Sequence, residues 1–204
     1  GEGHISSIVF RTGLIDKENN LELEPVGNLL EEAEHIRRHV YDKETFRSKL
    51  DEMEDFQGII PSGLILDKLG EKFTYGELRK CIEEDKKTLH LAPYKEMFFN
   101  QIMWLASSHY ELEFSLDTNL SERVIFPVSS NETNGIEDAR FVKFTDDNNE
   151  VTYYATYTAY DGVTILPKLL DTKDFYHFRV LPLHGEIARN KGMAMFPRKI
   201  NGLY

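Results

Sequence analysis

The chain contains little cysteine and no long apolar run. Cys81 is the only cysteine among 204 residues, which excludes an internal disulfide and any metal cluster built from several thiolates. The longest apolar stretch, from Met97 to Leu105, is interrupted by Asn100 and Gln101. Because a membrane-spanning helix needs roughly 20 apolar residues, we expect no such helix and no membrane partner.

Positive charge is also scarce. The 24 lysines and arginines face 35 acidic residues, which gives a net charge of −11. Because phosphate backbones require a basic surface, we expect no nucleic-acid partner. Glycine-rich phosphate loops and a serine nucleophile elbow are missing too. With 41% hydrophobic residues the chain can bury a core. These observations favour a cytoplasmic protein whose ligands are neutral or are attracted by a local patch of charge.

Both ends of the sequence predict a fragment of a longer protein. The chain starts with Gly1 rather than methionine, and residues 199–204 look like a strand, a turn and the first residues of a returning strand. Folded proteins avoid an unpaired edge strand of this kind. We therefore expect further strands beyond Tyr204.

The first half of the sequence predicts one strand followed by helices. Residues 4–12 carry a strand pattern. Helical spacing then runs through a set of apolar residues: Leu29, Ala33, Ile36, Val40, Phe46, Leu50 and Met53. Thr74 and Glu77 fit a capping box, and Pro93 suits the first turn of another helix. We expect residues 26–110 to be mostly helical.

The second half has a β pattern. The predicted strands cover residues 139–145, 151–159, 164–166, 175–181 and 193–200. Turn-forming residues separate them, at 146–149 and at Asp161-Gly162. Residues 139–143 and 194–198 are weakly alike, at an offset of 55. A repeat of this length built from short strands suggests propeller blades.

The polar loop from Ser129 to Arg140 is the first candidate site. It delivers Asp138 and Arg140 to the start of a strand, where a side chain is both rigid and accessible. Strand alternation predicts that these two residues share a side and that Glu137 faces away. The pair could also be a simple ion couple.

Two further groups could bind a ligand. The segment Arg189-Asn190-Lys191-Gly192, with Arg198 beyond it, is basic in an acidic chain and could hold a phosphate or sugar hydroxyls. A basic turn that offsets the acidic surface is the alternative. Tyr160 and Asp161 end a tyrosine-rich segment that suits carbohydrate, although packing between sheets explains some of its tyrosines.

A metal site is not expected. His35 and His39 have the spacing of a helical metal pair, but Ile36 stands where a zinc protease needs glutamate.

Three segments together resemble one family. SSNETNGIEDARFVKF, YYATYTAYDG and NKGMAMFPRKINGLY, in that order, are similar to the β-mannoside phosphorylases and mannosidases of glycoside hydrolase family 130. GEGHISSIVFRTG resembles the start of the same domain. The resemblance covers residues 1–13 and about 126–204.

The resemblance implies a mainly β fold, a five-bladed propeller with its active site in the central funnel. Residues 1–25 would supply strands of the first blade, 26–110 a helical insertion, and 111–204 further blades that are cut short at Tyr204. A homo-oligomer could form through the insertion, whose apolar face includes Phe98 and Leu105.

The resemblance also implies residue roles. Asp138 would be the general acid of an inverting reaction. Inorganic phosphate would be the co-substrate, with no other cofactor, and α-mannose 1-phosphate the product. The anion would lie near Lys191, Arg198 and Arg11. The family pattern often has an aspartate where Gly192 stands, which leaves the role of that loop open. The mannoside would contact five residues: Asn131, Asn134, Arg140, Tyr160 and Asp161.

Other functions remain open from the sequence. A β-mannosidase would hydrolyse the same linkage and would need a second carboxylate to activate water. A sugar-binding propeller without turnover is a third possibility. For the 204-residue chain on its own we expect no activity, because a propeller site needs all its blades.

Overall fold

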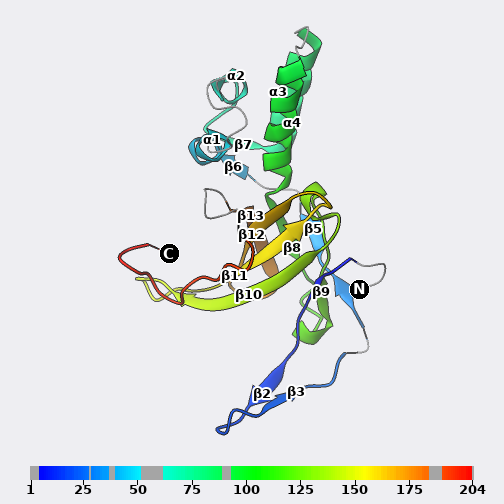
Figure 1. The fold of residues 1–204 in the computed structure, drawn as a ribbon, viewed down its shortest axis with the longest axis vertical. Coiled ribbons are helices and arrows are strands. Elements are labelled where there is room, and N and C mark those ends of the chain that lie inside the picture. Colours follow the sequence, from blue (N-terminus) through cyan, green and yellow to red (C-terminus); the bar gives the residue numbers. More distant parts are fainter. Residues whose placement is uncertain are drawn as a thin grey trace.

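The computed structural model describes residues 5–27, 29–36, 40–51, 62–88, 93–183 and 190–203. Figure 1 shows the helices gathered at one end of the molecule, a large curved sheet in the middle, and a small hairpin at the opposite end. The fold is mainly β, and none of its described sheets closes on itself.

The largest sheet has six strands, in the order β10-β11-β12-β13-β8-β5. All neighbours are antiparallel. The strands are β10 (Ile136–Thr145), β11 (Val151–Tyr160), β12 (Ile165–Thr172), β13 (His177–Pro182), β8 (Tyr110–Glu113) and β5 (Glu34–Ile36). Four consecutive strands, β10 to β13, therefore form a meander to which β8 and β5 are added. The apolar cluster beneath it includes Phe10, Leu112, Leu170 and Phe178.

Turn chemistry fixes the register of this meander. The Asp146 side chain accepts hydrogen bonds from the backbone N–H groups of Asn148 and Glu150, and Asn149 has a φ of 63°. Asp161 likewise accepts from two N–H groups in its own turn. Both predicted turns are confirmed, because the side chains that make them are local in sequence.

Smaller sheets surround the meander. The first has the order β1 (Ile8–Val9), β9 (Arg123–Ile125), β4 (Glu31–Glu32). A hairpin joins β2 (Gly13–Ile15) to β3 (Leu21–Leu23), and a last pair joins β6 (Val40–Asp42) to β7 (Lys72–Thr74).

Four α-helices form a second apolar cluster with β6 and β7. They are α1 (Lys43–Asp51), α2 (Gly63–Leu66), α3 (Tyr75–Thr88) and α4 (Pro93–Ser107). The capping box before α3 is confirmed: the Thr74 N–H donates to a Glu77 carboxylate oxygen at 2.7 Å, and the Glu77 N–H donates to Thr74 Oγ1 at 3.3 Å. The helix predicted from Pro93 is also confirmed.

The helix expected from the spacing of Leu29 to Val40 is wrong. That part of the chain contains β4, β5 and β6, so residues 26–110 are less helical than predicted. The reason is tertiary, since each of these short strands pairs with a partner far away in the chain: β9, β8 and β7. Phe46 and Leu50 do lie in a helix, with both side chains buried, whereas Met53 lies outside the described residues. The predicted strand 4–12 is reduced to Ile8–Val9 within its described part.

The strand predicted over residues 193–200 is wrong too. The described backbone there forms only a bridge between Ile200 and Leu203, around a two-residue turn at Asn201 and Gly202 with positive φ at both. The Met193 carbonyl accepts a side-chain hydrogen bond instead of a strand partner, and Pro197 has no N–H to donate. The second copy of the weak repeat is therefore not a strand.

The apolar face of α4 is used mainly inside the chain. Phe98 and Leu105 are buried in the helical cluster, while Met97 is 60% exposed. An oligomer through this region stays a prediction. Among the described helices none is long and apolar enough to cross a membrane.

Candidate active site

Asp138 lies on a β-bulge near the start of β10. Glu137 pairs with Thr158 and Arg140 pairs with Thr156, so Asp138 and Ala139 together oppose a single residue of β11. Asp138 has a φ of 58°, in the left-handed region that non-glycine residues rarely adopt. Strained backbone of this kind costs about 1–3 kcal/mol and is concentrated at functional sites. The bulge thus turns an exposed carboxylate out of the regular strand.

Asp138 lines a narrow cleft that has no room for a water molecule in this structure. Its other described lining residues are Thr156, Tyr157 and Thr158 of β11, Pro167 of β12, and Gly192 and Met193. The cleft therefore brings together the bulge, the middle of the meander and a segment that is more than 50 residues further along the chain.

Side chains of the meander hold the 190–193 segment in place. Arg140 Nη1 donates to the Gly192 carbonyl at 2.8 Å, and Thr156 Oγ1 donates to the Met193 carbonyl at 2.5 Å. Lys191 Nζ lies 3.8 Å from Glu137 Oε1. Arg140 thus contacts Gly192, which lines the cleft, and Lys191 precedes Gly192 in the chain, but of the three residues only Asp138 is among the described lining residues. Their predicted roles stay predictions.

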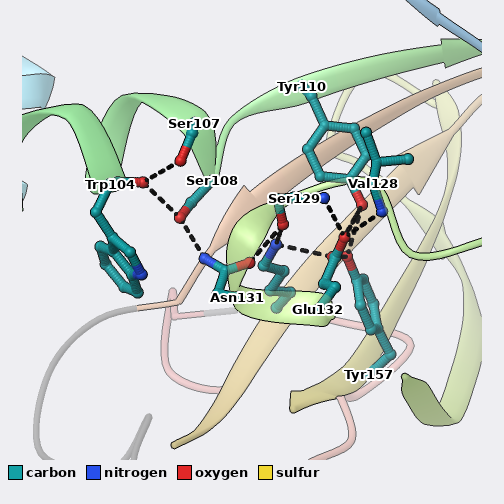
Figure 2. Close-up of polar contacts among 10 residues, drawn as sticks. Trp104, Ser107, Ser108, Tyr110, Val128, Ser129, Asn131, Glu132 and Tyr157 are labelled. Atoms are coloured by element: carbon teal, nitrogen blue, oxygen red, sulfur yellow. Dashed lines mark hydrogen bonds and ion pairs between the residues drawn. The ribbon is translucent and has the colours of Figure 1, made fainter. Parts of the chain in front are cut away.

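A buried polar network is centred on Glu132 and includes Tyr157 of β11 (Figure 2). The Glu132 carboxylate accepts hydrogen bonds from Lys168 Nζ at 2.8 Å and from the Tyr157 hydroxyl at 2.7 Å. Tyr110 and the backbone N–H groups of Val128 and Ser129 also donate to it. The Glu132 and Lys168 side chains are both fully buried.

The surroundings of Glu132 decide its ionisation. Burial alone raises the pKa of the carboxyl, but the Lys168 charge, the Lys168 hydrogen bond and the backbone N–H donors outweigh burial and lower that pKa to about 2. Burial lowers the pKa of Lys168, and Glu132 opposes this change. The two side chains therefore form an ion pair at neutral pH, and the Glu132 carboxylate also accepts hydrogen bonds from hydroxyl and backbone N–H groups.

Tyr157 connects this network to the candidate acid. It is the β11 residue that lies opposite Asp138 and Ala139 at the bulge, and it is among the residues that line the Asp138 cleft. Its hydroxyl donates a hydrogen bond to the Glu132 carboxylate. The ion pair thus anchors the strand against which the bulge is built, and so fixes where Asp138 stands.

Other predicted ligand residues have structural partners. Asn131 is buried; its amide donates to Ser108 Oγ at 2.6 Å and accepts from Ser129 Oγ at 2.5 Å. Asp161 is occupied by two N–H groups of its own turn. The Tyr160 hydroxyl donates to the Gly162 carbonyl at 2.8 Å.

The remaining predicted residues are not among the described residues that line the Asp138 cleft. Asn134 is exposed, and its backbone N–H donates to the Tyr160 carbonyl. Arg198 and Arg11 are exposed and do not line the described cleft. Arg189 lies outside the described residues.

Sequence reasoning missed the buried ion pair. One signal was present: Lys168 interrupts the apolar run from Ile165 to Leu170, and a lysine in a strand otherwise made for burial needs a partner. The identity of that partner, 36 residues earlier in a loop, could not be read from the pattern.

Comparisons with protein-family models, with curated proteins and with solved structures found no match for this chain.

Proposed function

We propose that this chain carries the acid half of an active site for inverting phosphorolysis of β-mannosides, with Asp138 as the general acid. The observation that carries the proposal is one cleft in which a carboxylate on a strained bulge lies beside a loop held by Arg140 and bearing Lys191. An acid with cations close by is what a phosphorolytic site requires.

The arrangement of strands is compatible with a propeller. A propeller blade is a sheet of four antiparallel strands, and β10 to β13 form a four-strand antiparallel meander in chain order. In a five-bladed propeller this meander would be one blade. Asp138 would then stand at the start of its first strand, facing the central funnel.

The chemistry assigns one role to each kind of group. A phosphate oxygen attacks the anomeric carbon from the face opposite the leaving sugar, and the glycosidic C–O bond breaks. Asp138 gives up its proton, relayed through a sugar hydroxyl, to the leaving oxygen. The products are α-mannose 1-phosphate and a saccharide shortened by one residue. Phosphate needs no base because it arrives as an anion.

The cations near the cleft suit this anion. Arg140 uses one of its five N–H donors on the Gly192 carbonyl, which leaves others for phosphate. The contact between Lys191 and Glu137 is long and half exposed, and surface pairs of this kind contribute only about 0–1 kcal/mol. The Lys191 ammonium can therefore exchange Glu137 for phosphate at little cost.

The test uses the full-length protein that contains this chain, with β-1,2- and β-1,4-mannobiose as substrates. With inorganic phosphate we expect α-mannose 1-phosphate, detected by ³¹P NMR, and no turnover without phosphate. Asp138→Asn should lower kcat by about 10²–10⁴-fold. As the matched control, Asp117→Asn replaces an exposed aspartate outside the cleft and should leave kcat unchanged.

Two outcomes would replace the proposal. Release of free mannose at a rate that ignores phosphate would assign the site to a β-mannosidase. Binding of mannobiose without turnover, unchanged by Asp138→Asn, would assign it to a sugar-binding propeller.

A further inference from the structure

A cavity of about 510 Å³ lies between the helices and the six-stranded sheet. Helix α4 contributes Asn100 and Trp104, the first residue of α3 contributes Tyr75, and the loop after β9 contributes Ser130. The cavity shares no lining residue with the Asp138 cleft. It is a second site, and its volume falls in the range of about 300–1,000 Å³ that is typical of small-molecule pockets.

The described lining of this cavity contains no aspartate, glutamate, lysine or arginine, and its two imidazoles are those of His35 and His109. An ion that entered it would lose hydration without gaining a fixed countercharge, which costs several kcal/mol in a partly buried site. The lining therefore selects a neutral molecule.

Aromatic rings form much of the wall. Tyr41 and His109 stack on each other, with ring centroids 5.7 Å apart. Trp104 and Tyr75 are half-buried, and neither ring packs on another ring within the described part of the chain. These two rings are platforms for a ligand with an apolar face.

Polar groups on the same wall are available to a ligand: Asn100 and Ser130 are exposed, and Tyr75 and Trp104 are half-buried. Within the described residues, no partner is found for the Asn100 amide, the Tyr75 hydroxyl, the Trp104 indole N–H or the Ser130 hydroxyl. This set combines donors and acceptors. It would satisfy a ligand whose rim carries several hydroxyl groups.

The wall beside Trp104 is rigid before any ligand arrives. The Trp104 carbonyl accepts hydrogen bonds from Ser107 Oγ at 2.9 Å and from Ser108 Oγ at 2.8 Å. Asn131 in turn donates to Ser108 Oγ at 2.6 Å, and Figure 2 shows this chain of contacts leading on to the buried Glu132 network. Fixed geometry of this kind lowers the entropic cost of binding.

From these observations we infer that the cavity binds a neutral pyranose ring. A pyranose has apolar C–H faces for Trp104 and Tyr75 and a rim of hydroxyls for Asn100 and Ser130. Its neutrality matches a described lining that offers no carboxylate, ammonium or guanidinium group. The inference stands on this cavity alone and does not depend on the reaction proposed for Asp138.

Trp104 is the only tryptophan in the chain, so its fluorescence reports on this cavity directly. Titration of the 204-residue chain with methyl β-D-mannopyranoside should give a saturable change in emission. Asn100→Ala and Tyr75→Phe should each weaken binding by about 3–10-fold, the usual effect of losing one hydrogen bond. Asn148→Ala, in an exposed turn of the meander, is the matched control and should bind like the unaltered chain.

Asp138→Asn separates this site from the proposed active site, because it should leave the fluorescence titration unchanged even if it abolishes turnover. Circular dichroism establishes that each variant is folded. The inference is overturned if a folded chain shows no saturable change, if Asn148→Ala weakens binding as much as Asn100→Ala, or if adenosine binds and the pyranoside does not.

Discussion

Lys168 and Glu132 are oppositely charged residues in the interior, and burying each charge without the other would cost free energy. Each side chain is fully buried, and each satisfies the other. Truncating one member of such a pair leaves an uncompensated charge and destabilises a protein by about 3–5 kcal/mol. We expect Lys168→Met to lower the free energy of unfolding by that amount in urea denaturation. The matched control is Lys173→Met, which removes an exposed pair with Glu150 and should cost at most about 1 kcal/mol.

A second substitution separates charge burial from simple loss of packing. The double variant Glu132→Gln/Lys168→Met removes both charges, and it should recover much of the stability that Lys168→Met loses. If Lys168→Met and Lys173→Met were equally stable, the two buried side chains would not form the ion pair described here.

Because the pKa of Glu132 is lowered in the folded protein, the free energy of unfolding depends on pH. Its value of about 2 in the folded protein lies below that of an unfolded glutamate, about 4.3. The unfolded chain therefore takes up the proton first as pH falls. The contribution of Glu132, about 3 kcal/mol, is complete above roughly pH 5 and is lost as pH falls toward 2. Urea denaturation at several pH values should show a shallower loss in the double variant than in the unaltered protein. Equal slopes would contradict this.

The positive φ of Asp138 lowers the stability of the fold but places the side chain on the bulge. A left-handed φ suits glycine and is costly for a β-branched residue. We expect Asp138→Gly to stay within about 1 kcal/mol of the unaltered protein and Asp138→Val to lose about 1–3 kcal/mol, measured by thermal denaturation. Equal stability of the two variants would show that φ at this position is not held positive.

At the scale of elements, the start of α3 depends on one local motif. The reciprocal hydrogen bonds between Thr74 and Glu77 satisfy N–H groups that a helix cannot satisfy itself. Thr74→Ala should destabilise the protein by about 1 kcal/mol in thermal denaturation. Glu83→Gln, on the same helix, removes only an exposed pair with Arg79 and should cost at most about 0.5 kcal/mol. Equal effects of the two changes would argue against the cap.

Elements that depend on local chemistry could be predicted, and elements that depend on distant partners could not. The capping box at Thr74 and the turn at Asp146 follow from side chains within a few residues. The strands between residues 31 and 42 form because β9, β8 and β7 meet them after long loops. A spacing that fits a helix cannot reveal this pairing.

In the candidate site, too, some features could be predicted from the sequence and others could not. Asp138, Arg140 and Lys191 could be found as residues; in the structure Asp138 lines the cleft, and Arg140 contacts Gly192, which lines it too. The bulge that places Asp138 could not be found, because strand alternation assumes a regular ladder. Asn131 and Asp161, expected to contact the mannoside, both have hydrogen-bond partners inside the chain: Ser108 is 23 residues away from Asn131, and the partner of Asp161 lies in its own turn.

For the whole molecule, the two apolar clusters set the positions of the two sites. The cluster beneath the meander supports the Asp138 cleft, and the helical cluster meets the sheet at the Trp104 cavity. The open edges of the described sheets are compatible with further blades that would complete a funnel around Asp138.

The most direct test of the account is phosphate-dependent turnover of mannobiose by the full-length protein, with and without Asp138→Asn. The account predicts α-mannose 1-phosphate only when phosphate is present, and a loss of about 10²–10⁴-fold in kcat for Asp138→Asn. Turnover that persists undiminished in Asp138→Asn would contradict it, because the bulge at Asp138 would then hold no catalytic acid.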